Sequence, residues 1–217
     1  MEHEHRLTFS DEPAHVRGLV LMLHGGAEHS LRAVDERNKQ LWRARWMFEQ
    51  VSGRFARSGV RTALLRFSLV GWNARHGEPA PVSDTRWALD RLREQYADLP
   101  VVLLGHSMGA RTAARSADDP AVAGVVGLAP WFPAGDPVEQ LAGKHLVGAH
   151  GRSDRITSAR ATRRYLERAA SVAASTRFVD RGRIGHYMLR DIRGWNRVAV
   201  EESLAIVDRV TGLTAGS

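Results

Sequence analysis

The chain has 217 residues, 43% of them hydrophobic, which suits one globular domain with a substantial core. Basic residues (31) outnumber acidic ones (24), but almost all are arginines scattered along the chain, whereas nucleic-acid binders typically gather their cations on one element. The sequence has no cysteine, which excludes disulfides, thiolate catalysis and a cysteine-ligated metal site.

The remaining composition bears on compartment and partners. No apolar run approaches the roughly 20 residues that a membrane-spanning helix needs. The acidic residues near the N-terminus, without an apolar stretch, do not resemble a secretory signal. We therefore expect a cytoplasmic protein with one domain over residues 1–217, no membrane span and no nucleic-acid partner, and the sequence leaves its oligomeric state open.

Apolar runs alternate with helical patterns along the chain, which predicts a mostly parallel sheet with helices on both faces. Continuous Val, Leu and Ala runs are expected in strands that are covered on both sides. The predicted parallel strands are Arg17–His24, Val60–Phe67, Val101–Leu104, Val122–Ala129, His145–Ala149 and Thr176–Val179. Arg6–Ser10 is a candidate for an additional antiparallel edge strand.

Helical patterns fill the intervals between these strands. The predicted helices are Leu41–Ser58, Ser83–Tyr96, Thr157–Val172 and Val198–Val210. Ser83 or Asp84 is suited to cap the second of them. The Gly- and Pro-rich segment Gly71–Pro81 is predicted as a long loop, and it follows the carboxyl end of a strand, where open α/β sheets place their ligand crevice.

The segment Gly105–Gly109 reads Gly-His-Ser-Met-Gly, directly after an apolar strand and before a helical stretch. In this context the G-x-S-x-G pattern places a nucleophilic serine on a strained strand-to-helix turn. The two glycines avoid collisions with neighbouring backbone, and the helix start behind the turn offers free N–H groups to negative charge. The pattern therefore predicts Ser107 as a nucleophile.

A serine hydroxyl needs a base and a group that orients the base. With this motif, the acid and the histidine follow the serine in that order, each after a later strand. Asp154 follows the predicted strand His145–Ala149, and His186 precedes the last helix. Asp180 is near His186 in sequence, but it lies at a strand end and we expect it not to reach the imidazole.

Acyl transfer also develops an oxyanion that needs two fixed N–H donors. Met108, the residue after the serine, is one candidate donor. Gly26 is the other, with Ala27 as its alternative, in the His-Gly-Gly-Ala segment that ends the first parallel strand. We expect His24 to hold this loop, and the side chain of His106 to point away from the site.

On these residues the chain resembles the α/β-hydrolase family over nearly its whole length. The segment Leu65–Asn73 is similar to a subgroup common in actinobacterial genomes. The resemblance implies the α/β-hydrolase fold with a minimal lid or none, because only 130–143 is available for one. It also implies Ser107 as nucleophile, Asp154 as acid and His186 as base, with Gly26 and Met108 as the oxyanion hole. Some members carry the acid one strand earlier, so Asp136 remains an alternative.

Members of the family similar to this chain include small carboxylesterases, thioesterases and enzymes like dienelactone hydrolase and monoacylglycerol lipase. The resemblance thus implies hydrolysis of a small-molecule ester or thioester through an acyl-enzyme, without metal or organic cofactor. Acyl transfer and peptide cleavage remain open, because they share every one of these motifs. A ligand-binding member of the fold without catalysis is the other alternative, but its expected mark, loss of one of Ser107, Asp154 and His186, is absent. Aromatic residues that follow the strands are predicted to contact the substrate, although the tryptophans could instead pack the sheet ends. They are Trp72, Trp131, Phe132 and Tyr187.

Overall fold

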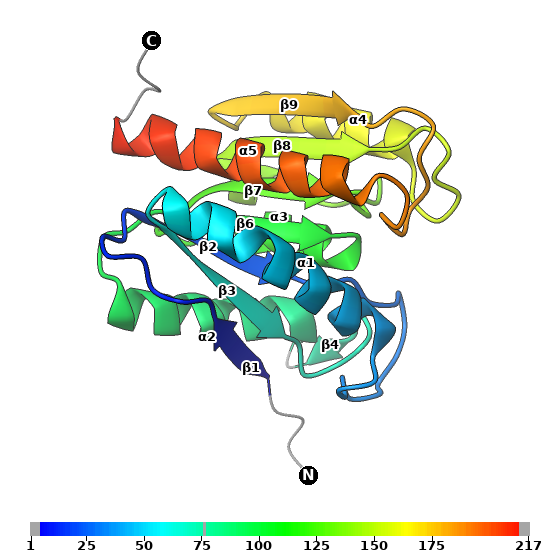
Figure 1. Ribbon diagram of the computed structural model, residues 1–217. Coiled ribbons are helices and arrows are strands. Elements are labelled where there is room, and N and C mark those ends of the chain that lie inside the picture. Colours follow the sequence, from blue (N-terminus) through cyan, green and yellow to red (C-terminus); the bar gives the residue numbers. More distant parts are fainter. Residues whose placement is uncertain (1–4, 76, 213–217) are drawn as a thin grey trace.

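A seven-stranded sheet in the order β1-β3-β2-β6-β7-β8-β9 forms the centre of the molecule (Figure 1). The computed structural model describes residues 5–75 and 77–212. Within these residues, the sheet is parallel throughout except where β1 pairs antiparallel with β3. Its strands are β1 Arg6–Phe9, β2 Gly18–Leu23, β3 Val60–Arg66, β6 Val101–His106, β7 Val122–Leu128, β8 His145–His150 and β9 Ser175–Asp180. The predicted sheet, including its antiparallel edge strand, is confirmed.

The strands differ in burial according to their place in the sheet. Every residue of the interior strand β2 is buried, as its unbroken apolar sequence predicts. The edge strand β9 has no buried residue and carries polar residues at both ends. The core therefore lies around β2, β6 and β7, and the residues of the edge strand β9 are less buried than those of the interior strands.

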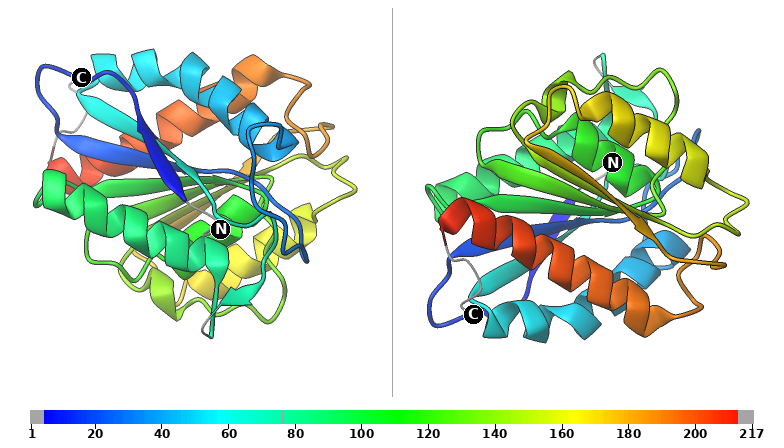
Figure 2. Two further views of the ribbon diagram at one scale, coloured as in Figure 1. Left: turned by 90° about the horizontal axis from the view of Figure 1, so that it is seen from below. Right: turned by 90° about the horizontal axis from the view of Figure 1, so that it is seen from above.

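Helices cover both faces of the sheet, as predicted (Figure 2). One face carries α1 and α5, which contact each other, and the opposite face carries α2, α3 and α4. The helices are α1 Lys39–Arg57, α2 Ala80–Gln95, α3 Met108–Arg115, α4 Ala159–Ala169 and α5 Ile192–Thr211. Side-chain caps define the first residues of two helices. The Asn38 side chain accepts free N–H groups in the first turn of α1, and the Ser158 side chain does the same for α4.

The predicted start of α2 is wrong. The helix begins at Ala80, with Pro81 in its first turn, where a missing N–H leaves no hydrogen bond unmade. Ser83 donates to Glu78 instead of capping, and the buried Asp84 accepts bonds from the loop after β3. The predicted long loop 71–81 therefore ends in the first turn of α2, and it also contains the two short strands β4 Ala74–Arg75 and β5 Glu78–Pro79.

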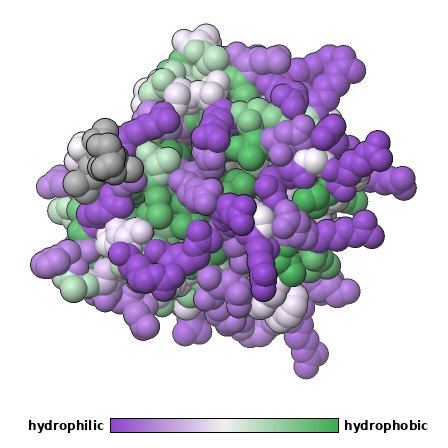
Figure 3. All heavy atoms as spheres, turned by 45° about the horizontal axis from the view of Figure 1, so that its top comes forward, coloured by the Kyte–Doolittle hydropathy of each residue, from purple (hydrophilic) through white to green (hydrophobic). Residues whose placement is uncertain are grey.

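All parallel strands end at one edge of the sheet, on the right in Figure 1, where the loops after β2, β3, β8 and β9 gather. The connection from β7 to β8 contains one short 3-10 helix, η1 Glu139–Leu141, so this connection supplies no lid. In the described part of the chain, no helix is long and apolar enough to cross a membrane. Hydrophilic side chains predominate on the face in Figure 3, with hydrophobic patches scattered among them.

Candidate active site

Ser107 lies on the turn between β6 and α3, with φ 55° and ψ −116°. A non-glycine residue in this region is strained and must be held by its surroundings. Here the Ser107 N–H donates to the Leu128 carbonyl at 3.1 Å, which anchors the turn to β7. A Cβ at Gly109 would lie 2.2 Å from the Leu23 carbonyl oxygen, and one at Gly105 would lie 2.4 Å from the backbone of α3. The two glycines therefore allow the backbone contacts that hold the strained turn.

The structure brings His186 and Asp154 to this serine from two further loops. His186, between β9 and α5, has Nε2 3.1 Å from Ser107 Oγ. Its Nδ1 lies 2.8 Å from Oδ2 of Asp154, which follows β8. Ser107 is 8% exposed and His186 6%, and the Asp154 side chain is 1% exposed. Hydroxyl, imidazole and carboxylate thus form one continuous, largely water-excluded chain.

Asp154 is held by several hydrogen bonds. Its Oδ1 accepts the backbone N–H groups of Ile156 and Thr157, at 2.8 and 2.9 Å. Its Oδ2 accepts the Thr157 hydroxyl at 2.9 Å and contacts His150 Nε2 at 3.1 Å. Burial acts to raise the pKa of Asp154, but the bonds from His150, His186 and the two amides hold this pKa well below its usual range. The carboxylate is therefore ionised at neutral pH.

The other two candidate acids lie elsewhere. Both oxygens of Asp136 bind the Arg111 guanidinium, at 2.6 and 2.7 Å. Asp180 accepts the Gly182 N–H and pairs with Arg152. Asp154 is therefore the carboxylate that contacts the imidazole of His186.

The loop after β2 lies beside the start of α3. The Ala27 N–H donates to the Val70 carbonyl at 2.9 Å, so it is not available to an oxyanion. Among the described residues, the N–H groups of Gly26 and Met108 have no hydrogen-bond acceptor. A Cβ at Gly26 would lie 2.3 Å from the Val70 oxygen and 2.4 Å from the Met108 side chain. The loop is packed too closely here for any residue larger than glycine.

Two further histidines flank this arrangement. His24 Nε2 accepts the Phe67 N–H at 3.1 Å, so its Nδ1–H donates to the Gly25 carbonyl, at 2.6 Å. His24 therefore holds its loop, as expected. The expectation for His106 is wrong, because its Nε2 donates to the His186 carbonyl at 3.0 Å and the two rings are 4.9 Å apart. Burial and the nearby His186 lower the pKa of His106 to about 3. The His106 ring is therefore neutral, and it holds His186 in place through the bond to its carbonyl.

The predicted aromatic contacts divide into two groups. The Arg111 guanidinium lies 4.2 Å from the ring centre of Trp72 and 4.3 Å from that of Trp131, so both indoles pack against a cation. Phe132 is buried and stacks on Tyr165, so it belongs to the core and does not form an open wall. Tyr187 is exposed beside His186, with ring centres 5.4 Å apart, and thus lies at the opening of the site.

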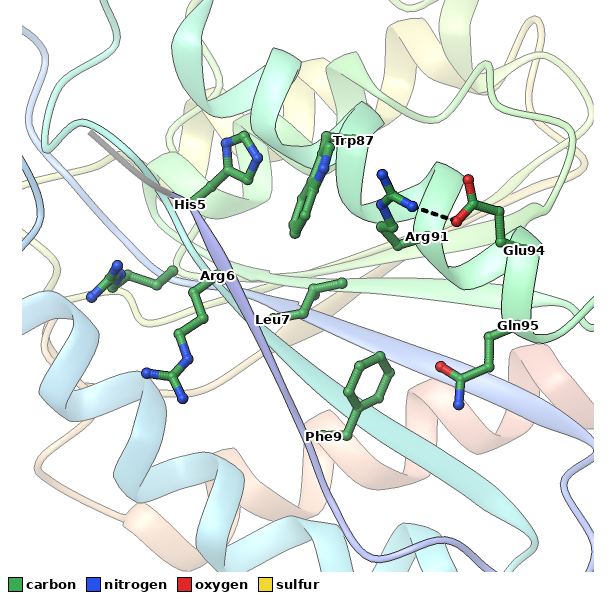
Figure 4. A pocket seen from close by; sticks show the side chains of 9 residues that line it. His5, Arg6, Leu7, Phe9, Trp87, Arg91, Glu94 and Gln95 are labelled. Atoms are coloured by element: carbon green, nitrogen blue, oxygen red, sulfur yellow. Dashed lines mark hydrogen bonds and ion pairs between the residues drawn. The ribbon is translucent and has the colours of Figure 1, made fainter. Parts of the chain in front are cut away.

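A groove of about 850 Å³ lies away from this site, between β1 and α2 (Figure 4). Leu7, Phe9 and Trp87 supply its apolar side chains, and Arg91, paired with Glu94, stands on its α2 side. The groove contains no residue of the serine-centred arrangement. In the described part of the chain, no group of three or more His, Asp or Glu side chains is placed to bind a metal ion.

Sequence reasoning missed three polar residues around the site, namely His150, Thr157 and Arg111. One local signal existed, because His150 is four residues before Asp154 at the end of β8. The contacts of Thr157 with His186 and of Arg111 with Trp72 join loops and helices that are distant in sequence. They could be found only after the sheet was assembled.

Comparisons with known proteins agree with this architecture. A family model described as the alpha/beta hydrolase family matches residues 20–210. A comparison with curated protein sequences found no match. Among solved structures, the propionate-bound esterase Est2 from the Planctomycetes species Thermogutta terrifontis is 15% identical with a TM-score of 0.72, over 99% of this chain and 92% of that one.

A second similar structure is XC6422 from Xanthomonas campestris, a member of the α/β serine hydrolases without a lid. It is 16% identical with a TM-score of 0.64, over 92% of this chain and 89% of that one. An α/β serine hydrolase homologue from Coxiella burnetii is 14% identical with a TM-score of 0.67, over 91% of each chain. The family match spans most of the sequence, and the strand order agrees with it: the chain belongs to the alpha/beta hydrolase family.

Proposed function

We propose that this protein is a serine hydrolase that cleaves a carboxylic ester or thioester through an acyl-enzyme on Ser107. One observation carries the proposal, namely the chain of contacts from Ser107 Oγ through His186 to the ionised Asp154. Since an ionised carboxylate can only accept, His186 donates from Nδ1 and turns the lone pair of Nε2 toward the serine hydroxyl. That is the tautomer a general base needs.

The proposed reaction has two steps. Ser107 Oγ bonds to the substrate carbonyl carbon while His186 Nε2 takes the hydroxyl proton, and the oxyanion accepts the N–H groups of Gly26 and Met108. Collapse of the tetrahedral species expels the alcohol or thiol, which receives that proton from His186. Water then attacks the acyl-enzyme, with His186 again as base, the bond from Ser107 Oγ to the acyl carbon breaks to release the carboxylic acid, and His186 returns the proton to Ser107 Oγ. Asp154 stays ionised and stabilises the imidazolium in both steps.

The packing of the aromatic residues favours a short acyl group, because it leaves little apolar wall for a long one. Phe132 is buried against Tyr165, and Trp72 and Trp131 are occupied by Arg111, which leaves Tyr187 as the aromatic side chain at the opening. The esterase Est2 carries propionate in one structure and butyrate in another. We propose acyl chains of similar size for this protein. Its cytoplasmic location remains a prediction from the sequence.

Fluorophosphonate labelling tests the proposal, because the probe phosphonylates activated serines. The native protein should be labelled and Ser107→Ala should not, while Ser171→Ala, an exposed serine at the end of α4, should be labelled like the native protein. A series of p-nitrophenyl esters from acetate to octanoate should show the highest kcat/KM at the short end. No labelling of the folded native protein would refute the proposal, and labelling without ester turnover would favour peptide or acyl-transfer chemistry instead.

A further inference from the structure

We infer that His150 is a positioning residue of the proposed site, whose Nε2–H holds the Asp154 carboxylate in the orientation that serves His186. The inference rests on the proposed function, because it assigns a task within the same arrangement. His150 is the last residue of β8 and is fully buried. It does not reach Ser107, so it acts on the chemistry only through Asp154.

The geometry places one carboxylate oxygen between two imidazoles. Oδ2 of Asp154 lies 2.8 Å from His186 Nδ1 and 3.1 Å from His150 Nε2. The Asp154 side chain is 1% exposed and that of His150 is 0% exposed, so water does not compete for these contacts. A carboxylate that is tied to one ring at the end of β8 and to another in the loop after β9 has little freedom to rotate.

The proton positions around His150 follow from its neighbours. Because the carboxylate can only accept, His150 must donate to it from Nε2. In the neutral ring, Nδ1 is then an acceptor, and the Thr162 hydroxyl of α4 lies 2.8 Å from it. The Asp154 carboxylate therefore fixes the tautomer of His150, while β8 fixes the position of its ring. The Thr162 hydroxyl lies against Nδ1 and is also 3.2 Å from the Ser158 carbonyl.

A purely structural histidine would need only one of these two bonds. The bond to Thr162 already ties the end of β8 to α4, whereas the bond to Asp154 adds a donor to a carboxylate that has two amide donors on its other oxygen. Without His150, the fixed donors on Oδ2 are His186 itself and the Thr157 hydroxyl. That hydroxyl is also 3.2 Å from the Ala129 carbonyl and can give its single proton to only one of them.

Two substitutions separate the bonds that His150 makes. In His150→Gln the side-chain amide nitrogen reaches the former position of Nε2 and can still donate to Asp154. In His150→Asn the amide reaches only the position of Nδ1, near Thr162, so the bond to Asp154 is lost. Loss of a hydrogen bond to a charged group corresponds to roughly a 10- to 100-fold change in an equilibrium or rate. We expect kcat to fall by about this factor in His150→Asn, with KM within about twofold of the native value, and His150→Gln to recover most of it.

The matched control is His145→Asn. His145 begins the same strand β8 and also binds a hydroxyl through Nδ1, that of Ser175 at 2.8 Å, but it lies at the opposite end from the site. His145→Asn should keep the native kcat. Thermal unfolding of all three variants would show whether kcat follows stability or the donor to Asp154.

The results test this inference and the proposed function separately. Equal kcat in His150→Gln and His150→Asn, or a native kcat in His150→Asn, would overturn the positioning role while fluorophosphonate labelling of native Ser107 left the hydrolase proposal intact. A decrease that is matched by an equal loss of kcat in His145→Asn would also overturn it, since it would reflect damage to β8. Absence of labelling in the native protein would remove the proposed function itself.

Discussion

The contact around Gly26 yields a prediction whose size can be worked out from the structure. A methyl group there would lie 2.3 Å from the Val70 carbonyl oxygen, and Cβ atoms do not approach other atoms closer than 3.0 Å. The Met108 side chain can turn aside, but the Val70 oxygen is backbone and also accepts the Ala27 N–H. In Gly26→Ala the loop must therefore move by about 0.7 Å, which takes the Gly26 N–H out of hydrogen-bond reach of an oxyanion.

Removal of one oxyanion donor lowers kcat by about 10²- to 10³-fold in measured cases, and we expect that range for Gly26→Ala. The assay is turnover of p-nitrophenyl acetate by the folded protein, with kcat and KM determined separately. The bound substrate uses this donor less than the transition state does, so kcat should change more than KM. The control is Gly135→Ala in the β7–β8 connection, where an added methyl group meets nothing within 4 Å. A folded Gly26→Ala protein with kcat within threefold of native would refute the role assigned to this loop.

Three further predictions concern stability and the acid. Asp154→Asn should lower kcat by about 10⁴-fold, while Asp136→Asn, which breaks a mostly buried ion pair with Arg111, should retain activity but lower stability by about 2 kcal/mol and Tm by about 6 °C. Equal losses of activity in both variants would contradict the assignment. Burial lowers the pKa of His24 from 6.5 to about 4, so the unfolded chain binds more protons between these values. His24 alone should therefore lower stability by about 3 kcal/mol from pH 7 to pH 4, beside a similar contribution from His106, and a urea titration should show a shallower fall in His24→Gln. Tyr165→Phe should cost about 1 kcal/mol, measured the same way, because its hydroxyl donates to the partly buried Pro137 carbonyl.

The strands could be predicted from sequence because a strand that is buried on both faces consists almost entirely of apolar residues. β2, β6 and β7 are almost pure Val, Leu, Ala and Gly, and their bounds agree with the predicted ones to within a few residues. Helix starts were harder, because they depend on partners elsewhere. Asp84 is a residue type that often caps helices, yet its carboxylate accepts hydrogen bonds from the backbone N–H and the hydroxyl of Ser68, after β3.

The start of α5 gives a second example. The predicted start, Val198, follows the apolar pattern, but the helix begins at Ile192 behind the cap residue Asp191. Gly194 looks like a helix breaker in the sequence. In the structure it makes room for the cap, since a Cβ there would lie 2.1 Å from the Asp191 carboxylate. A residue that weakens the helix locally is thus required by the contact that starts it.

The site shows the same division. The order Ser107, Asp154, His186 could be predicted because each follows its own strand, and the catalytic roles of the three remain predictions. The partners of these residues could not be predicted, because a second histidine on Asp154 and a cation between Trp72 and Trp131 result from packing between distant segments. Composition carries no record of such pairs.

The uneven burial of the sheet has a consequence for how this protein would lose function. Ser107 and Gly26 follow the buried strands β6 and β2, but Asp154 and His186 follow β8 and β9, and β9 has no buried residue. Regions with little buried surface open at lower free energy than the core does. A partial opening at this margin would carry the base away from the nucleophile while the centre stayed folded. Inactivation in mild denaturant would then precede global unfolding, and activity would report the local equilibrium of β9.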